Sequence, residues 1–243
     1  MRGILDRVAD QWHSNFQPQT TLEFLALRLA QKLGEPGAAK HYLGLIGQHG
    51  EARVLAAYRR ATASAHQAGG LARGFHSALE RVNANGNGNG NGKTFRLLAI
   101  KVQRRSVAVA FFIGTQLDYT QIHHLPSAHD KAESSAFGFV NSMISHLKAE
   151  SAALERLAPN HEVLRHVLSH IVEGVLVSHG LPVWTADKGT LLPCFGHPAP
   201  RSRAEVRKAI CAIWPVLGPE AGILDAVALG LYIQTEGLFS LES

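Results

Sequence analysis

A run of alternating asparagine and glycine, NANGNGNGNGK at positions 83–93, constrains the fold of this chain more than any other feature. The run has no apolar face and a high backbone entropy, so it stabilises neither a helix nor a strand. We expect it to be a flexible linker. The chain therefore divides into a region 1–82 and a region 94–243.

Region 1–82 has helical patterns and no strand pattern. TTLEFLALRLAQKLG, at 20–34, carries leucines near helical spacing between a capping threonine and a glycine. Further helices are predicted around 42–46, in 51–68 and in 71–82. The first residues, MRGILDRVADQWH, predict the start of an amphipathic helix and not a signal peptide, because they have no continuous apolar core. We expect a small all-helical domain, similar to the helical modules of plasmid and phage replication proteins.

Region 94–243 alternates between strand and helix patterns. Strands are predicted at FRLLAIKV (95–102), SVAVAFFIG (106–114), LDYTQIHHL (117–125), SAALERL (151–157) and GLPVWTA (180–186), the last of them buried. Helices are predicted at about 132–147, 162–179, 201–217 and 222–236. A meander followed by α/β units predicts an α+β/α/β fold.

In this order and spacing, region 95–236 resembles a RuvC-type Holliday-junction resolvase of the ribonuclease H-like superfamily. The resemblance is carried by LLAIKVQRRSVAVAFF at the first two strands, by AALERL and LPV at later strands, and by AEVRKAICAIWPVL and LDAVALGLYIQ at the closing helices. It implies a ribonuclease H-like mixed five-stranded sheet flanked by helices, with the first three strands antiparallel and in order.

The resemblance also implies where catalytic acids stand. In this family, clustered carboxylates hold two magnesium ions that activate water against a phosphodiester. The matching acids in this chain are Glu155 and Asp225, but Lys101 occupies the first-strand position and Gly222 a further position on the last helix. We therefore expect a degenerate site without metal or other cofactor, in which Lys101 pairs with Glu155 or Asp225. Magnesium is expected only if the site is active.

Basic residues are the candidates for contact with nucleic acid. The net charge is +5, and region 1–82 holds ten basic and six acidic residues. A basic excess favours polyanion partners, although solvated surface charge explains it equally well. The residues that we expect to contact phosphates are Arg104, Arg105, Arg201, Arg203, Arg207, Lys208, Arg53, Arg59 and Arg60.

Three functions fit these patterns. The first is a DNA-binding or RNA-binding scaffold subunit with a degenerate nuclease site. The second is an active magnesium-dependent, structure-selective endonuclease whose site is rebuilt with another acid, such as Asp118 or Glu220. The third is a protein–protein interaction module.

Partners and location follow from the same resemblance and from composition. We expect DNA rather than RNA, other proteins of a replication, recombination or defence complex, and a homodimer as in the resolvases. No apolar run reaches the roughly 18 residues that cross a membrane, so no membrane partner is expected. Two cysteines without a CxxC pair suit a reducing cytoplasm.

Overall fold

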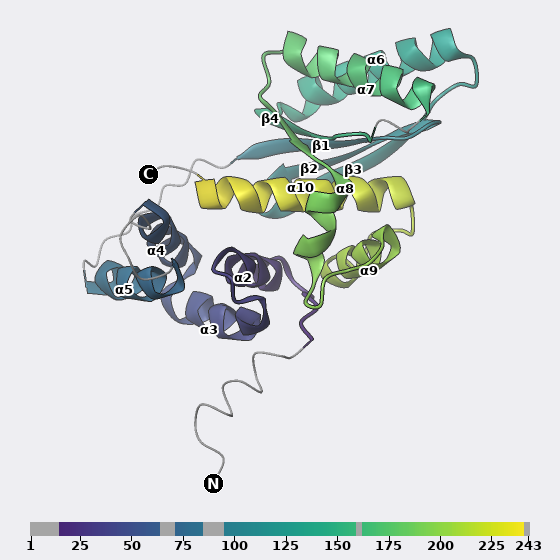
Figure 1. The fold of residues 1–243 in the computed structure, drawn as a ribbon. Helices are drawn as coiled ribbons and strands as arrows, with labels where there is room; N and C mark the ends of the chain where they lie inside the picture. The colour runs from purple at the N-terminus through teal and green to yellow at the C-terminus, as the bar shows by residue number, and fades with distance from the viewer. Residues whose placement is uncertain (1–14, 64–70, 85–94, 159–161, 241–243) are drawn as a thin grey trace. The chain divides into compact units, whose positions relative to one another are not determined.

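The computed structural model describes residues 15–63, 71–84, 95–158 and 162–240 (Figure 1). The N-terminal helix predicted at 1–13 and positions 85–93 of the predicted linker lie outside these residues. Helix α5 ends at Ala84, so the first two residues assigned to the linker belong to a helix. The chain forms two compact units: unit 1 comprises Met1–Lys93, Cys194–Pro200 and Thr235–Ser243, and unit 2 comprises Thr94–Pro193 and Arg201–Gln234.

Helices build the N-terminal part of unit 1. They are α2 (Thr21–Lys32), η1 (Pro36–Ala38), α3 (Ala39–His49), α4 (Glu51–Ala63) and α5 (Leu71–Ala84). The Thr20 hydroxyl caps α2 by accepting a hydrogen bond from the Glu23 amide at 3.1 Å. Apolar faces of these helices share one core with Phe239, from the end of α10. Arg28 and Lys32 pair with Glu236 at 2.5 Å and 2.6 Å, which ties this C-terminal segment to α2.

Unit 2 is built on one mixed five-stranded sheet. Its strands are β1 (Arg96–Val102), β2 (Ser106–Ile113), β3 (Gln116–His124), β4 (Ser151–Glu155) and β5 (Val183–Ala186), and their order is β3-β2-β1-β4-β5. β1, β2 and β3 pair antiparallel, whereas β4 runs parallel to β1 and β5 parallel to β4. This is the ribonuclease H-like sheet predicted from the sequence, and the prediction is confirmed.

Helices cover both faces of this sheet (Figure 1). α6 (His129–Leu147) and α7 (Val163–Ser178) pack with Leu98 and Ile100 of β1 in one core. α10 (Ala221–Ser240) packs on the opposite face, where a methyl group added to Gly230 would lie 3.0 Å from the Cβ of Ala99. Successive side chains of a strand point to opposite faces, so even positions of β1 face α6 and α7 and odd positions face α10.

The last strand differs from its prediction. The sequence predicts a buried strand at 180–186, but β5 lies at the edge of the sheet and Trp184 is 44% exposed. Beyond β5 the chain forms α8 (Lys188–Leu191), η2 (Leu192–Phe195) and α9 (Arg203–Ile213). Within the described part of the chain, no helix combines the length and the apolar character that crossing a membrane requires.

Candidate functional site

The site begins with a lysine at the end of the central strand. Lys101 is an odd position of β1, so its side chain points toward α10 and away from α6 and α7. Only 4% of this side chain is exposed. A buried ammonium is costly unless it is paired, which requires acidic partners nearby.

The neighbouring parallel strand supplies the first partner. Ile100 of β1 pairs with Leu154 of β4, so Lys101 and Glu155 come next to each other at the same end of the sheet. The Lys101 ammonium forms an ion pair with Oε2 of Glu155, whose side chain is 5% exposed. Parallel strands bring their carboxyl ends to one edge, which is where α/β sheets place their ligands.

The last helix supplies the second acid. Asp225, in the first turns of α10, places Oδ2 at 3.8 Å from the Lys101 ammonium, and its side chain is 6% exposed. Lys101 therefore stands within ion-pair distance of both carboxylates, whereas the prediction was a pair with Glu155 or Asp225.

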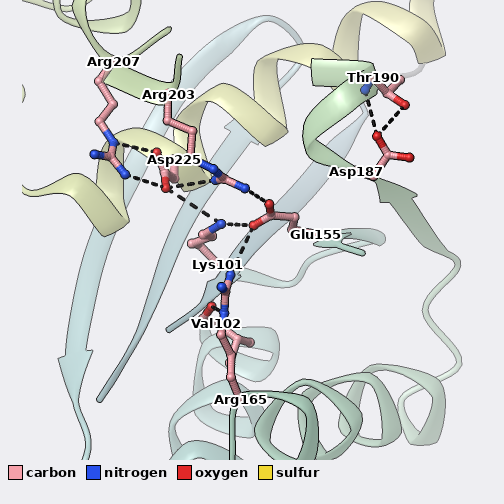
Figure 2. Close-up of polar contacts among 9 residues, drawn as sticks. All are labelled: Lys101, Val102, Glu155, Arg165, Asp187, Thr190, Arg203, Arg207 and Asp225. Carbon is pink, nitrogen blue, oxygen red and sulfur yellow. Dashed lines mark hydrogen bonds and ion pairs between the residues drawn. The ribbon is translucent and has the colours of Figure 1, made fainter. Parts of the chain in front are cut away.

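Three arginines complete the cluster (Figure 2). Arg207 donates two hydrogen bonds to Asp225, from Nε to Oδ1 at 2.7 Å and from Nη2 to Oδ2 at 2.9 Å. Arg203, one turn earlier on α9, donates to Oδ2 of Asp225 at 3.1 Å and to Oε1 of Glu155. Arg165 of α7 lies 3.6 Å from Oε2 of Glu155 and donates to the carbonyl of Val102 at 2.9 Å.

The surroundings of these arginines affect them differently. The hydrogen bond to Asp225 raises the pKa of Arg207. Burial lowers the pKa of Arg165, an effect that the charge of Asp225 opposes. Arginine remains charged in proteins, so the cluster holds three guanidinium cations besides the Lys101 ammonium, and these face two carboxylates.

A two-metal nuclease centre does not fit these residues. All four carboxylate oxygens of Glu155 and Asp225 already face a cationic side chain. Magnesium needs oxygen ligands at about 2.0–2.1 Å, and the ammonium and guanidinium groups would repel it strongly at that range. The residues that the structure describes contain no group of three or more histidine, cysteine, aspartate or glutamate side chains suited to a metal ion.

The other acidic positions do not rebuild a metal centre. A Cβ on Gly222 would lie 3.0 Å from Oε1 of Gln103 and 3.2 Å from the Cβ of Ala108, so a carboxylate at this position lacks room. Asp118 and Glu220 are exposed and do not line the cleft described next.

The cluster forms the floor of a cleft in unit 2 with a volume of about 950 Å³. Its acidic residues are all engaged: besides Glu155 and Asp225, Glu162 pairs with Arg104 at 2.9 Å, and Asp187 accepts hydrogen bonds from Thr190. These bonds to Thr190 lower the pKa of Asp187. The basic side chains outnumber the acidic ones and are Lys101, Arg104, Arg156, Arg165, Lys188, Arg203 and Arg207.

The structure divides the predicted phosphate-contacting residues into three groups. Arg104, Arg203 and Arg207 line the cleft. Arg105, Arg201 and Lys208 are exposed on unit 2 and do not line it. Arg53, Arg59 and Arg60 lie on α4 in unit 1, where Arg60 is exposed and Arg59 donates to the carbonyl of Leu55 at 3.3 Å.

Sequence reasoning missed three basic residues of the cleft: Arg156, Arg165 and Lys188. Arg156 directly follows β4, and Lys188 lies two residues after β5. Ligands bind outside the carboxyl ends of strands in α/β sheets, so the position of Lys188 after the strand predicted at 180–186 was a usable signal. Arg156 lies inside the strand predicted at 151–157, which hid its position at the end of the observed strand. Arg165 lies in the first turn of α7 and carries no comparable signal.

Comparisons with known proteins give likenesses of structure only. No protein-family model and no curated protein matches the sequence. RuvC of T. thermophilus in complex with a Holliday junction substrate aligns over 60% of this chain and 94% of its own, at 12% identity and a TM-score of 0.48. The yeast mitochondrial Holliday junction resolvase Ydc2 aligns over 78% and 95%, at 8% identity and a TM-score of 0.45.

The Fowlpox virus resolvase, solved with Holliday junction DNA, aligns over 58% of this chain and 98% of its own, at 11% identity and a TM-score of 0.37. All three TM-scores are below 0.5. The assignment of the fold therefore rests on the strand order and strand directions described above.

Proposed function

We propose that this protein binds nucleic acid, DNA rather than RNA, in the cleft of unit 2 without cleaving it, and so acts as a binding or scaffold subunit. The observation that supports this proposal is that Glu155 and Asp225 already form ion pairs with lysine and arginine side chains of the protein itself. The resemblance to the resolvases implies that Lys101, Glu155 and Asp225 correspond to positions where a nuclease of this family holds its metals. The positive charge of the cleft favours a polyanion, and the engaged carboxylates disfavour hydrolysis through metal ions.

Unit 1 adds three basic residues to the proposal. Arg53, Arg59 and Arg60 on α4 remain predicted phosphate contacts. If both units bind one nucleic acid, each raises the effective concentration of the other, and deletion of 1–82 should weaken binding more than the loss of any single charge.

The proposal is tested with purified full-length protein and labelled four-way junction, duplex and single-stranded DNA. We expect binding that weakens steeply as salt rises, because each phosphate contact releases counterions. We expect no cleavage in Mg²⁺ or Mn²⁺. Cleavage that disappears in Asp225→Asn would instead establish the endonuclease. Absence of binding at about 50 mM salt, where phosphate contacts are strong, would favour the protein–protein interaction module.

A further inference from the structure

The order of exposure within the cleft indicates which charge a ligand meets. The Glu155 and Asp225 side chains are 5% and 6% exposed, whereas the Arg203 and Arg207 side chains are 27% and 30% exposed. The carboxylates therefore lie behind the guanidinium groups. A ligand that enters the cleft contacts these two arginines before it reaches Glu155 or Asp225. The exposed acids of the lining, Glu162 and Asp187, are held by Arg104 and Thr190.

We propose that the cleft binds a phosphate group directly on its own arginine and lysine side chains, with no metal ion between them. In this arrangement Glu155 and Asp225 are counter-ions that hold Arg203 and Arg207 in position, and they are not ligands. This inference rests on the proposed function and names the chemical group that the cleft recognises.

The arginines retain donors for such a ligand. A guanidinium has five N–H donors in a planar fork that matches the oxygens of a phosphate. Arg203 directs one bond to Asp225 and one to Glu155, and Arg207 directs two to Asp225. Three N–H donors of each guanidinium remain outside these bonds. The bonds to the carboxylates hold the two guanidinium groups in position, and the remaining donors can bind the oxygens of a phosphate.

Lys188 supplies a further positive charge. It lines the same cleft, is exposed, and its ammonium has no ion-pair partner among the residues that the structure describes. Arg156 also lines the cleft, and its guanidinium donates a hydrogen bond to the neutral hydroxyl of Thr185 at 3.1 Å. A phosphate would therefore add charge pairing to these side chains without displacing a salt bridge of Lys188.

The lining also indicates what the cleft does not recognise. No aromatic side chain is among the described residues that line it, so it offers no ring for a base to stack on. A volume of about 950 Å³ exceeds the needs of one phosphate and suits a short stretch of sugar–phosphate backbone. We therefore expect recognition of phosphate groups with little dependence on base sequence.

The test measures fluorescence anisotropy of labelled oligothymidylate with a 5′-hydroxyl end, at constant ionic strength, in EDTA and in Mg²⁺. We expect the same affinity in both, and we expect Lys188→Gln to reduce it about fivefold at 0.1 M salt, the contribution of one phosphate contact on a single strand. The salt slope should fall by about 0.7. The Arg203→Gln variant should also reduce the affinity for oligothymidylate. Arg203→Lys should retain part of this affinity because it keeps the charge.

The matched control is Lys148→Gln. Lys148 is exposed and its carbonyl accepts a hydrogen bond from Arg96, at the opposite end of β1 from the cleft. Its replacement removes the same charge from unit 2 and should leave the affinity within about twofold, because exposed charges beyond the Debye length are screened.

Two further arms separate the sources of the phosphate. Inorganic phosphate should compete with oligothymidylate more strongly than chloride does at equal ionic strength. If internal phosphodiesters are the ligand, a 5′-phosphorylated oligothymidylate should bind no more than about twofold tighter than the 5′-hydroxyl form. A larger gain would assign the cleft to terminal or free phosphate, still without metal.

Binding that requires Mg²⁺, or that responds equally to Lys188→Gln and Lys148→Gln, would overturn the inference while leaving DNA binding by the protein intact. Absence of binding to every oligonucleotide, with no effect of inorganic phosphate on the thermal unfolding of unit 2, would reject both this inference and the proposed function. Stabilisation by inorganic phosphate without DNA binding would reject the proposed function alone.

Discussion

Replacement of Glu155 by glutamine tests the charge arrangement directly. The wild-type cluster has four cationic side chains and two carboxylates, and the substitution leaves one carboxylate among the same four cations. Lys101, 4% exposed, then keeps only Asp225, at 3.8 Å. Two unit charges about 4 Å apart interact by about 4 kcal/mol at an effective dielectric constant of about 20. Removing one partner of a buried ion pair costs about 3–5 kcal/mol, and we expect this loss for Glu155→Gln.

The sign of the effect separates two kinds of site. In an empty metal centre, clustered carboxylates repel one another, so neutralising one of them stabilises the apoprotein. In this cluster the same substitution leaves cations unpaired and should destabilise unit 2. Lys101→Met should cost less, about 1–2 kcal/mol, because Glu155 keeps Arg203 and Arg165. The double variant should lose less than the sum of the two, with a coupling of about 0.5–3 kcal/mol.

Urea unfolding followed by tryptophan fluorescence measures these differences. Trp184 and Trp214 belong to unit 2, and a Trp12→Phe background removes the remaining tryptophan signal. With a slope of about 2 kcal/mol per molar urea, Glu155→Gln should lower the midpoint by about 1.5–2.5 M. Glu173→Gln, at an exposed position of α7, is the control and should change stability by less than about 0.5 kcal/mol. An unchanged or higher midpoint for Glu155→Gln would refute the argument.

Three other predictions concern packing, pH and metals. Gly230→Ala should destabilise unit 2 by about 1–3 kcal/mol, because the new methyl group would overlap the Phe112 ring. Gly138→Ala, on α6 with open space around it, is the control and should stabilise unit 2 by up to about 1 kcal/mol. Thermal unfolding of the two variants measures the difference. Burial alone would raise the pKa of Glu236, but hydrogen bonds from Lys32 and Arg28 lower it below its ordinary value of 4.5. Unit 1 should therefore lose stability as pH falls below about 4.5. Glu236→Gln should weaken this loss of stability at acid pH, measured by circular dichroism. Lys101→Asp should not confer Mg²⁺-dependent cleavage of a four-way junction, since arginines still occupy the carboxylates; cleavage by this single variant would show that the lysine alone blocks metal binding.

The sequence alone determined the elements of unit 2 and their class. The runs at β1 and β2 are apolar over almost their whole length, as expected of central strands buried on both faces, and both are buried in the structure. The short polar turn at 103–105 joins them antiparallel. The resemblance to the resolvases, and not local spacing, grouped Lys101, Glu155 and Asp225 into one cluster. The parallel pairing of β1 with β4 accounts for the proximity of the first two.

Only the tertiary structure decided which arginines pair with the buried acids and to which unit two short C-terminal segments belong. Arg203 and Arg207 reach Asp225 across 22 and 18 residues of sequence, a contact set by the packing of α9 against α10 that no local spacing encodes. The structure also decided that β5 is an edge strand. A short apolar run has the same sequence pattern in an edge strand and in a central strand, so the sequence could not distinguish them. The segments Cys194–Pro200 and Thr235–Ser243 joined unit 1 because their apolar side chains bury against its helices. Periodicity assigns a side chain to one face of its own element, but the partner on that face depends on which distant elements pack there.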